Sequence, residues 1–277
     1  VRWTIGDVSD RGFEALRLSM WGMWRLFGPA AAYAVCVNTI PLEQAKKRAG
    51  GTPEGVVWRD ATHEVPAFLR QRFNEQMAEG VGWKLAPVRV FPERYEISLD
   101  NDCILWGVPT AMRQWLCDAE PSRCLIAEDV RACFGQFAEL CGTGGRNLGI
   151  RGLPPGFDLE AVLCDVLGEV EGTRNGRIRL TSELDEQGLQ TAALSRIVSP
   201  RLVTLDDVTV CSPFYPHLPH LGRCGAHFVG LNARHIEWNY YDRPADGWMA
   251  EHWQRHRGSL YEKTGTPGCG VESCERS

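Results

Sequence analysis

The chain has 277 residues, of which 44% are hydrophobic and 23% are charged, as expected for a globular protein with a substantial core. Its formal net charge of −5, with no basic stripe, argues against nucleic acid as a partner, because phosphate backbones are bound by clustered Lys and Arg. The most apolar stretch, residues 26–42, is interrupted by Gly28 and Pro29 and is too short to span a bilayer, so we expect no transmembrane segment.

The cysteine content does not indicate a disulfide scaffold. There are eleven cysteines, an odd number, and the sequence shows no signal peptide. Cys36, Cys103, Cys133 and Cys164 stand among apolar neighbours, which is typical of buried, reduced thiols. We therefore expect a cytoplasmic protein.

The first half of the chain alternates strand and helix patterns. Asp10 is a plausible N-cap for the first of the helices. The nearly continuous apolar run at 32–37 is typical of a parallel strand buried on both faces. The expected strands are 2–5, 32–37, 55–58 (ending at Arg59 and Asp60) and 97–99, and the expected helices are 11–27 and 66–79. This alternation predicts an α/β fold with a mostly parallel, twisted sheet flanked by helices.

The second half is less regular. Its expected helices are 109–117, 129–141, 157–167 and 185–195, and its clearest strand is 148–150. Residues 209–235 mix short strands with proline turns, and from Lys263 the Gly, Thr, Pro and Cys content predicts a disordered tail at 263–277. We expect a single domain over residues 1–262.

Asp100 and Asp102 are the strongest candidates for a functional site. They directly follow the apolar strand pattern that ends at Leu99. Ligands of open α/β sheets bind at the carboxyl ends of the strands, and magnesium or manganese takes one or two carboxylates together with phosphate oxygens. The pattern therefore favours a divalent cation beside a phosphate group.

Two other interpretations of this pair stay open. An Asp-x-Asp after a strand is also common as a solvated turn. Haloacid-dehalogenase phosphatases place the same pair after a strand, where Asp100 would attack phosphate. That motif stands on the first strand and is followed two residues later by Thr or Val, whereas here three strands precede it and Ile104 occupies that position.

A series of motifs in order resembles glycosyltransferases of the GT-A fold, which use nucleotide-sugar donors. The first is Asp100-Asn101-Asp102, and Asn147-Leu148-Gly149-Ile150 is similar to the strand that shapes the donor-sugar pocket. Asp185-Glu186-Gln187 is similar to the acidic helix start near the sugar, and Ala226-His227-Phe228-Val229-Gly230 to the late metal-binding His. One departure is Asn232-Ala233-Arg234, where the family often has Lys-Pro-Trp.

The resemblance implies a Rossmann-like fold with a nucleotide-binding half (1–105) and a less regular sugar and acceptor half (106–262). It implies a hexosyltransferase-like enzyme of the retaining type, with a UDP- or GDP-type sugar donor and an unidentified acceptor. The implied metal ligands for Mn²⁺ or Mg²⁺ are Asp100, Asp102 and His227. The implied catalytic residues are Asp185, Glu186 and Gln187. A catalytically silent nucleotide-sugar-binding protein of the same fold is a further alternative.

Further donor contacts are expected around this centre. Thr4 and Asp60, at the ends of the first and third strands, are placed to contact base and ribose. Lys84 could neutralise a phosphate, although an isolated Lys is usually solvated. The remaining donor-binding candidates are Asn101, Asn147 and Gly149.

His227 provides a geometric test, because a core or surface histidine is the ordinary alternative. If it shares a metal with the carboxylates, it lies within about 8 Å of Asp102. We expect it at the carboxyl ends of the strands, with Asp185 or Glu186 on the same rim. The alternative to a catalytic role for Asp185 and Glu186 is that they only place favourable negative charge in the first turn of a helix.

Overall fold

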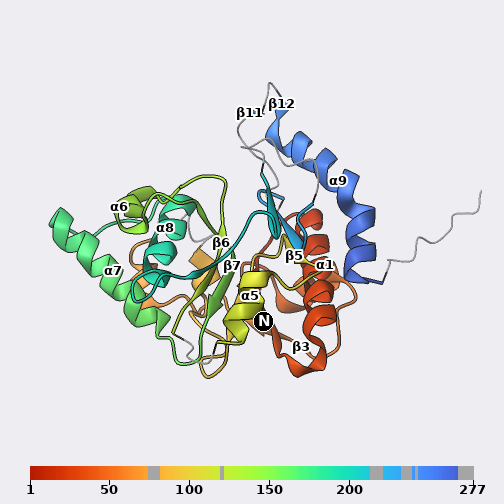
Figure 1. The fold of residues 1–277 in the computed structure, drawn as a ribbon, viewed down its shortest axis with the longest axis horizontal. Coiled ribbons are helices and arrows are strands. Elements are labelled where there is room, and N and C mark those ends of the chain that lie inside the picture. The colour runs from red at the N-terminus through yellow and green to blue at the C-terminus, as the bar shows by residue number, and fades with distance from the viewer. Residues whose placement is uncertain (74–81, 119–121, 213–220, 232–238, 241–242, 268–277) are drawn as a thin grey trace, which may run out of the picture.

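The computed structural model describes residues 1–73, 82–118, 122–212, 221–231, 239–240 and 243–267, built around a seven-stranded sheet (Figure 1). The strand order is β3-β2-β1-β4-β7-β6-β8. The strands are β1 (Arg2–Ile5), β2 (Tyr33–Val37), β3 (Val56–Asp60), β4 (Glu96–Leu99), β6 (Leu125–Glu128), β7 (Arg146–Leu153) and β8 (Arg201–Val203). Within this sheet β7 runs against both neighbours and the other pairs are parallel. The predicted mostly parallel α/β fold is confirmed.

Helices cover both faces of this sheet. The helices of the described structure are α1 (Asp10–Phe27), α2 (Leu42–Ala49), α3 (Ala67–Arg70), α5 (Thr110–Leu116), α6 (Ala138–Cys141), α7 (Leu159–Arg174), α8 (Glu183–Leu194) and α9 (Ala245–Thr264). The described residues also form short 3₁₀ turns: η1 (Gly28–Ala30), η2 (Gly82–Leu85) and η3 (Gly135–Phe137). Helices α1, α2 and α5 share one apolar core with the sheet, and α7 and α8 share a second.

Strand residues alternate between these two sides, as the period of two requires. Trp3, Ile97 and Leu99 belong to the core that contains α1. Arg2 and Ser98, the intervening residues of β1 and β4, therefore lie on the face that α8 covers. This second face carries the polar side chains on which the site depends.

A second, smaller sheet follows the end of β4. It has the order β5-β10-β9, from β5 (Cys103–Leu105), β9 (Val208–Cys211) and β10 (Gly225–Phe228). A two-stranded ribbon, β11 (Asn239–Tyr240) and β12 (Arg243–Pro244), precedes α9. In Figure 1, α9 lies beside α1, where Arg257 and Tyr261 donate hydrogen bonds to Glu14 at 2.7 Å.

The cap of the first helix differs from the prediction. Ser9, not Asp10, is the N-cap, and its hydroxyl accepts a hydrogen bond from the Gly12 amide at 3.1 Å. Asp10 is the first helical residue, and its carboxylate pairs with Arg48 instead. Ser9 also donates to the Leu231 carbonyl at 3.0 Å, so the cap joins distant parts of the chain.

Two predicted helices are shorter than expected. Helix α3 ends at Arg70 because Phe73 pairs with Leu180 as an isolated bridge, and residues 74–79 of the predicted helix lie outside the described residues. Of the helix predicted at 129–141, only residues 135–141 are helical, as η3 and α6. Residues 129–134 are not helical, because the φ of +49° at Gly135 stops an α-helix from extending through this position.

The predicted tail begins too early in the sequence. Helix α9 continues to Thr264, which is buried and shares a hydrogen bond at 2.6 Å with Thr266, which is also buried. Residues 268–277 lie outside the described residues.

The cysteine prediction is confirmed only in part. Cys36 and Cys103 are buried free thiols, and Cys133 is partly buried. Cys164 is exposed, because it lies on the outer side of α7 while its apolar neighbours in the sequence face the core. Among the described residues, no helix combines the length and apolarity needed to cross a bilayer. The cytoplasmic location stays a prediction.

The N-cap assignment generates a stability prediction. Ser9→Ala should lower the free energy of unfolding by about 1 kcal/mol, because the Gly12 amide loses its acceptor. Asp10→Ala should leave it nearly unchanged, because the Asp10 side chain is 96% exposed. Urea unfolding of the two variants measures both values, and a larger loss for Asp10→Ala would contradict the assignment.

Candidate active site

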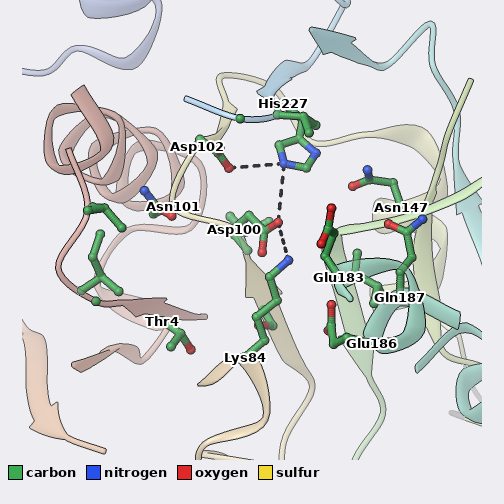
Figure 2. A pocket seen from close by; sticks show the side chains of 18 of the residues that line it. Thr4, Lys84, Asp100, Asn101, Asp102, Asn147, Glu183, Glu186, Gln187 and His227 are labelled. Atoms are coloured by element: carbon green, nitrogen blue, oxygen red, sulfur yellow. Dashed lines mark hydrogen bonds and ion pairs between the residues drawn. The ribbon is translucent and has the colours of Figure 1, made fainter. Parts of the chain in front are cut away.

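A cavity of about 320 Å³ opens at the carboxyl ends of β1 and β4 (Figure 2). The start of β7 reaches the same edge of the sheet, because this strand runs antiparallel to β4. The first turn of α8 forms the opposite wall. The cavity thus lies where open α/β sheets bind their ligands.

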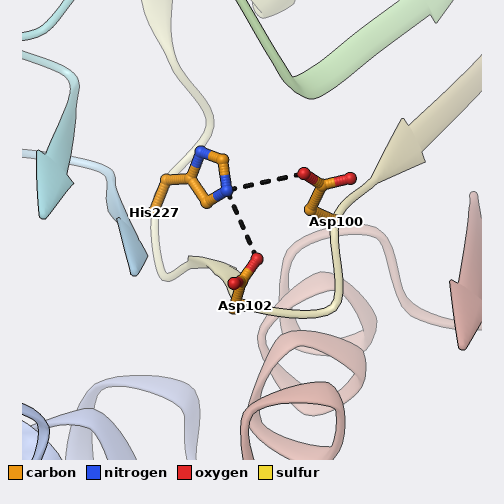
Figure 3. A group of neighbouring side chains, drawn as sticks. All are labelled: Asp100, Asp102 and His227. Carbon is orange, nitrogen blue, oxygen red and sulfur yellow. Dashed lines mark ion pairs between the residues drawn. The ribbon is translucent and has the colours of Figure 1, made fainter. Parts of the chain in front are cut away.

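Asp100, Asp102 and His227 form one cluster at this cavity (Figure 3). The Nε2 atom of His227 lies 3.3 Å from an oxygen of Asp102 and 3.5 Å from an oxygen of Asp100. One ligand atom from each residue can be chosen so that all lie within 4.8 Å of one another. The expectation that His227 lies within about 8 Å of Asp102 is therefore met.

The pairing of β5 with β10 brings His227 to the carboxylates. In this antiparallel pair His227 stands opposite Cys103, the residue after Asp102. The Phe228 amide donates a hydrogen bond to the Asp102 carbonyl at 3.0 Å, which continues the pairing into the Asp-x-Asp turn. Residues far apart in the sequence thus become neighbours through one strand pair.

Gly149 holds the cluster from the side of β7. Its carbonyl accepts a hydrogen bond from the Asp100 amide at 3.0 Å. A Cβ atom at this position would lie 2.3 Å from Nδ1 of His227, so only glycine leaves room for the imidazole. Asn147, which lines the cavity, accepts a hydrogen bond from the Gly149 amide at 2.7 Å and donates to Asp129 at 3.1 Å.

Lys84 is the cation nearest to the cluster in the described structure. Its Nζ lies 2.8 Å from the Asp100 carboxylate, and Figure 2 shows Lys84, Asp100 and His227 joined in a line. Burial by itself would raise the pKa of Asp100, but Lys84 and His227 hold that pKa far below its usual range.

The carboxylates in turn raise the pKa values of Lys84 and His227. Burial by itself would lower the pKa of Lys84, but Asp100 and other acidic neighbours raise it above its usual value. Burial likewise opposes the charged form of His227, but hydrogen bonds to Asp100 and Asp102 raise its pKa to about 9. The metal-free site therefore contains a protonated imidazole at neutral pH.

Asn101 and Thr4 also line the cavity. Asn101 is buried, and its amide donates a hydrogen bond to the Gly12 carbonyl at 2.9 Å, which anchors the turn to α1. Thr4 accepts a hydrogen bond from Arg2 at 3.0 Å. Their predicted contacts with the donor stay predictions.

The three predicted catalytic residues all lie on α8, but only two of them face the cavity. Glu186 and Gln187 line the cavity, together with Glu183, which sequence reasoning missed. Asp185 does not line it: its oxygens accept hydrogen bonds from the Gln136 amide at 2.9 Å and the Thr181 amide at 2.8 Å. These bonds outweigh the effect of burial and lower the pKa of Asp185. Asp185 therefore shapes the helix start.

Asp60 is also outside the cavity lining. It ends the edge strand β3, is exposed, and accepts a hydrogen bond from the Thr62 amide at 2.9 Å. Asn38, which follows β2, lines the cavity instead and was missed, although the same rule for strand ends could have found it. Its buried Nδ2 has no hydrogen-bond partner among the residues that the structure describes.

The sequence matches no protein-family model and no curated protein. The structure is similar to the galactosyltransferase LgtC in complex with donor and acceptor sugar analogues, with 11% identity and a TM-score of 0.50. That match covers 95% of this chain and 99% of LgtC. It is also similar to the apo bifunctional glycosyltransferase WbbM, with 12% identity, a TM-score of 0.51, and coverage of 95% of this chain and 51% of WbbM. The chain has the GT-A fold, as its motifs predicted.

The contact of Gly149 with His227 generates a prediction about metal binding. Gly149→Ala should weaken Mn²⁺ binding by about 10- to 100-fold, because the new methyl group displaces the imidazole. Titration calorimetry with Mn²⁺ measures the affinity. Gly168→Ala on the exposed side of α7, where a Cβ meets nothing, is the control and should bind normally. Equal affinities for the two variants would exclude His227 as a ligand.

The protonated state of His227 predicts how metal binding depends on pH. A metal takes the neutral imidazole, so binding below a pKa of about 9 must release one proton. The affinity for Mn²⁺ should rise about tenfold per pH unit from near neutrality and level off near pH 9. Calorimetry in buffers of different ionisation enthalpy counts the released proton. In His227→Gln the slope should disappear, and a slope that persists would assign the proton to another group.

Proposed function

We propose that this protein is a metal-dependent glycosyltransferase that transfers a sugar from a UDP- or GDP-type donor to an acceptor. The observation that carries the proposal is the convergence of Asp100, Asp102 and His227 at the cavity edge where α/β folds bind nucleotides. The GT-A fold, found in glycosyltransferases with bound donor and acceptor analogues, supports the same class of reaction.

The residues of the cluster fit a hard divalent cation. Two carboxylates and one imidazole suit Mn²⁺ or Mg²⁺, which complete their coordination with phosphate oxygens and water. When bound, such an ion supplies Lewis-acid stabilisation of the negative charge on a departing nucleoside diphosphate. Asp100, Asp102 and His227 would hold it.

Different walls of the cavity would contact different parts of the donor. Lys84 offers a positive charge beside the cluster and would contact the phosphates once a metal takes over Asp100. The first turn of α8 lines the same space through Glu183, Glu186 and Gln187. Thr4, Asn38 and Asn101 lie on the β1 and β2 side, where base and ribose would bind.

The sugar would lie between the cluster and α8. Glu186 and Gln187 project from that helix into the cavity and would stabilise positive charge at the anomeric carbon. Asn147 and the backbone at Gly149 would border the sugar from β7. We propose retention of anomeric configuration, supported by the late His that the chain shares with retaining members. The anomeric signal of the first product in proton NMR distinguishes retention from inversion.

A pair of matched substitutions tests the proposal. Asp102→Asn should abolish Mn²⁺-dependent binding of UDP and GDP while leaving the fold intact, because the cluster loses a charged ligand. Asp60→Asn removes an exposed carboxylate at the end of another strand and should bind as the wild type does. Thermal shift with a panel of UDP- and GDP-sugars reads donor binding through the rise in melting temperature.

Three outcomes separate the classes of function. Slow donor hydrolysis that requires Mn²⁺ or Mg²⁺ supports the transferase. Donor binding without any turnover would identify a silent nucleotide-sugar-binding protein. Hydrolysis of p-nitrophenyl phosphate, with beryllofluoride trapped at Asp100, would replace the proposal with a dehalogenase-type phosphatase.

A further inference from the structure

A row of polar side chains crosses the sheet at the floor of the cavity. Arg2 of β1 stands beside Ser98 of β4, and Ser98 stands opposite Arg151 of β7. Neighbours in register project from the same face of a sheet, so the three form one row on the face covered by α8. Ser98 lines the cavity, whereas Arg2 and Arg151 are almost completely buried below it.

Arg151 reaches the cavity wall through a relay of two hydrogen bonds. Its Nη1 donates to Oε1 of Gln190 on α8, and Nε2 of Gln190 donates to Oε1 of Glu186. Arg151, Gln190 and Glu186 are 2%, 1% and 2% exposed. Of the three, Glu186 alone lines the cavity.

The relay has a fixed direction because a guanidinium only donates hydrogen bonds. The oxygen of the Gln190 amide must therefore face Arg151, and its NH₂ group must face Glu186. Glu186 is held as an acceptor through Oε1. Its second oxygen, Oε2, is then the one left for a sugar hydroxyl or for developing positive charge.

The burial of Arg151 lowers the stability of the fold unless its charge and its N–H groups are compensated. Its Nε and Nη2 have no hydrogen-bond partner in the part of the chain that the structure describes. Burial lowers its pKa to about 10, and well-packed apolar residues are often at least as stabilising as a buried charge. Packing alone does not account for an arginine here.

We propose that Arg151 and Gln190 are positioning residues that hold the Glu186 carboxylate in one orientation toward the donor sugar. The proposal rests on the glycosyltransferase function inferred above. It extends that function to two residues that touch neither the metal cluster nor the cavity.

The charges around Glu186 support this role. Burial raises the pKa of Glu186 to about 7, and Asp100, at the end of β4, pushes it in the same direction. Lys84 of η2 and Arg151 of β7 lower it, and so does the hydrogen bond from Gln190. Without the relay, Glu186 would be both less fixed and more often protonated at neutral pH.

Arg151→Met, Gln190→Met and the double variant test the relay, because methionine keeps the length of both side chains. Thr191→Val is the control: Thr191 is the neighbour of Gln190, equally buried, and its hydroxyl has no partner among the described residues. Binding of UDP with Mn²⁺ should be unchanged in all four variants. The kcat for hydrolysis of the donor sugar that the wild type accepts should fall about 10- to 100-fold in the three relay variants.

Two measurements distinguish a positioning role of Arg151 and Gln190 from a purely structural role. The double variant should lose no more activity than Gln190→Met, because the two residues act in one series. The pKa of Glu186, measured by carboxylate ¹³C NMR in the metal-free protein, should rise in both single relay variants and stay constant in Thr191→Val. The NMR arm needs no turnover.

The two proposals fail in different ways. A wild type that binds neither UDP nor GDP with Mn²⁺ would refute the glycosyltransferase function. A wild type that binds and hydrolyses donor, with Gln190→Met as active as Thr191→Val, would overturn the relay alone. An unchanged pKa of Glu186 in Arg151→Met and Gln190→Met would overturn it as well.

Discussion

The register of strand β10 against β5 is the constraint on which the site depends. The pairing sets His227 opposite Cys103 and ties the Phe228 amide to the Asp102 carbonyl. A slip of one residue would turn the imidazole to the other face of this small sheet. Gly225 adds to the constraint, because a Cβ there would lie 2.3 Å from the side chain of Leu105 and 2.8 Å from the Ile104 carbonyl.

Charge balance is the second organising feature of the cavity. Asp100 is shared by Lys84 and His227, so the metal-free protein holds two cationic side chains against its carboxylates. A divalent ion bound here would replace charge that the protein already supplies. The released Lys84 would then face the phosphates of a donor. The cluster would thereby alternate between a state neutralised by Lys84 and His227 and a ligand-bound state.

Local sequence patterns predicted the site only where its chemistry follows directly on a strand. Asp100 and Asp102 could be found from the apolar run before them, but His227 lies 125 residues after Asp102 (227 − 102), and its place depended on the family resemblance. The rule for strand ends chose Asp60 over Asn38, because a sequence does not say which strand is at the edge. The helix predicted at 129–141 failed at a glycine whose positive φ depends on tertiary packing beside Asp185. The roles of Arg151 and Gln190 could not be predicted from the sequence either, because their contacts depend on strand register and burial.

The small sheet β5-β10-β9 is made of strands of three or four residues, and it is separate from the seven-stranded sheet. One side of it packs on α1 and α9 through a cluster that includes Ile104, Phe228 and Trp253, whereas Cys103, Leu105 and Val208 belong to the core of the large sheet. A change that shifts β10 against β5 would take His227 away from the carboxylates. The affinity for a bound ion would therefore depend on how firmly β10 is held against β5. An ion held by Asp100, Asp102 and His227 would join the end of β4 to the small sheet, and a substitution that loosens the packing of Phe228 would weaken the binding of that ion.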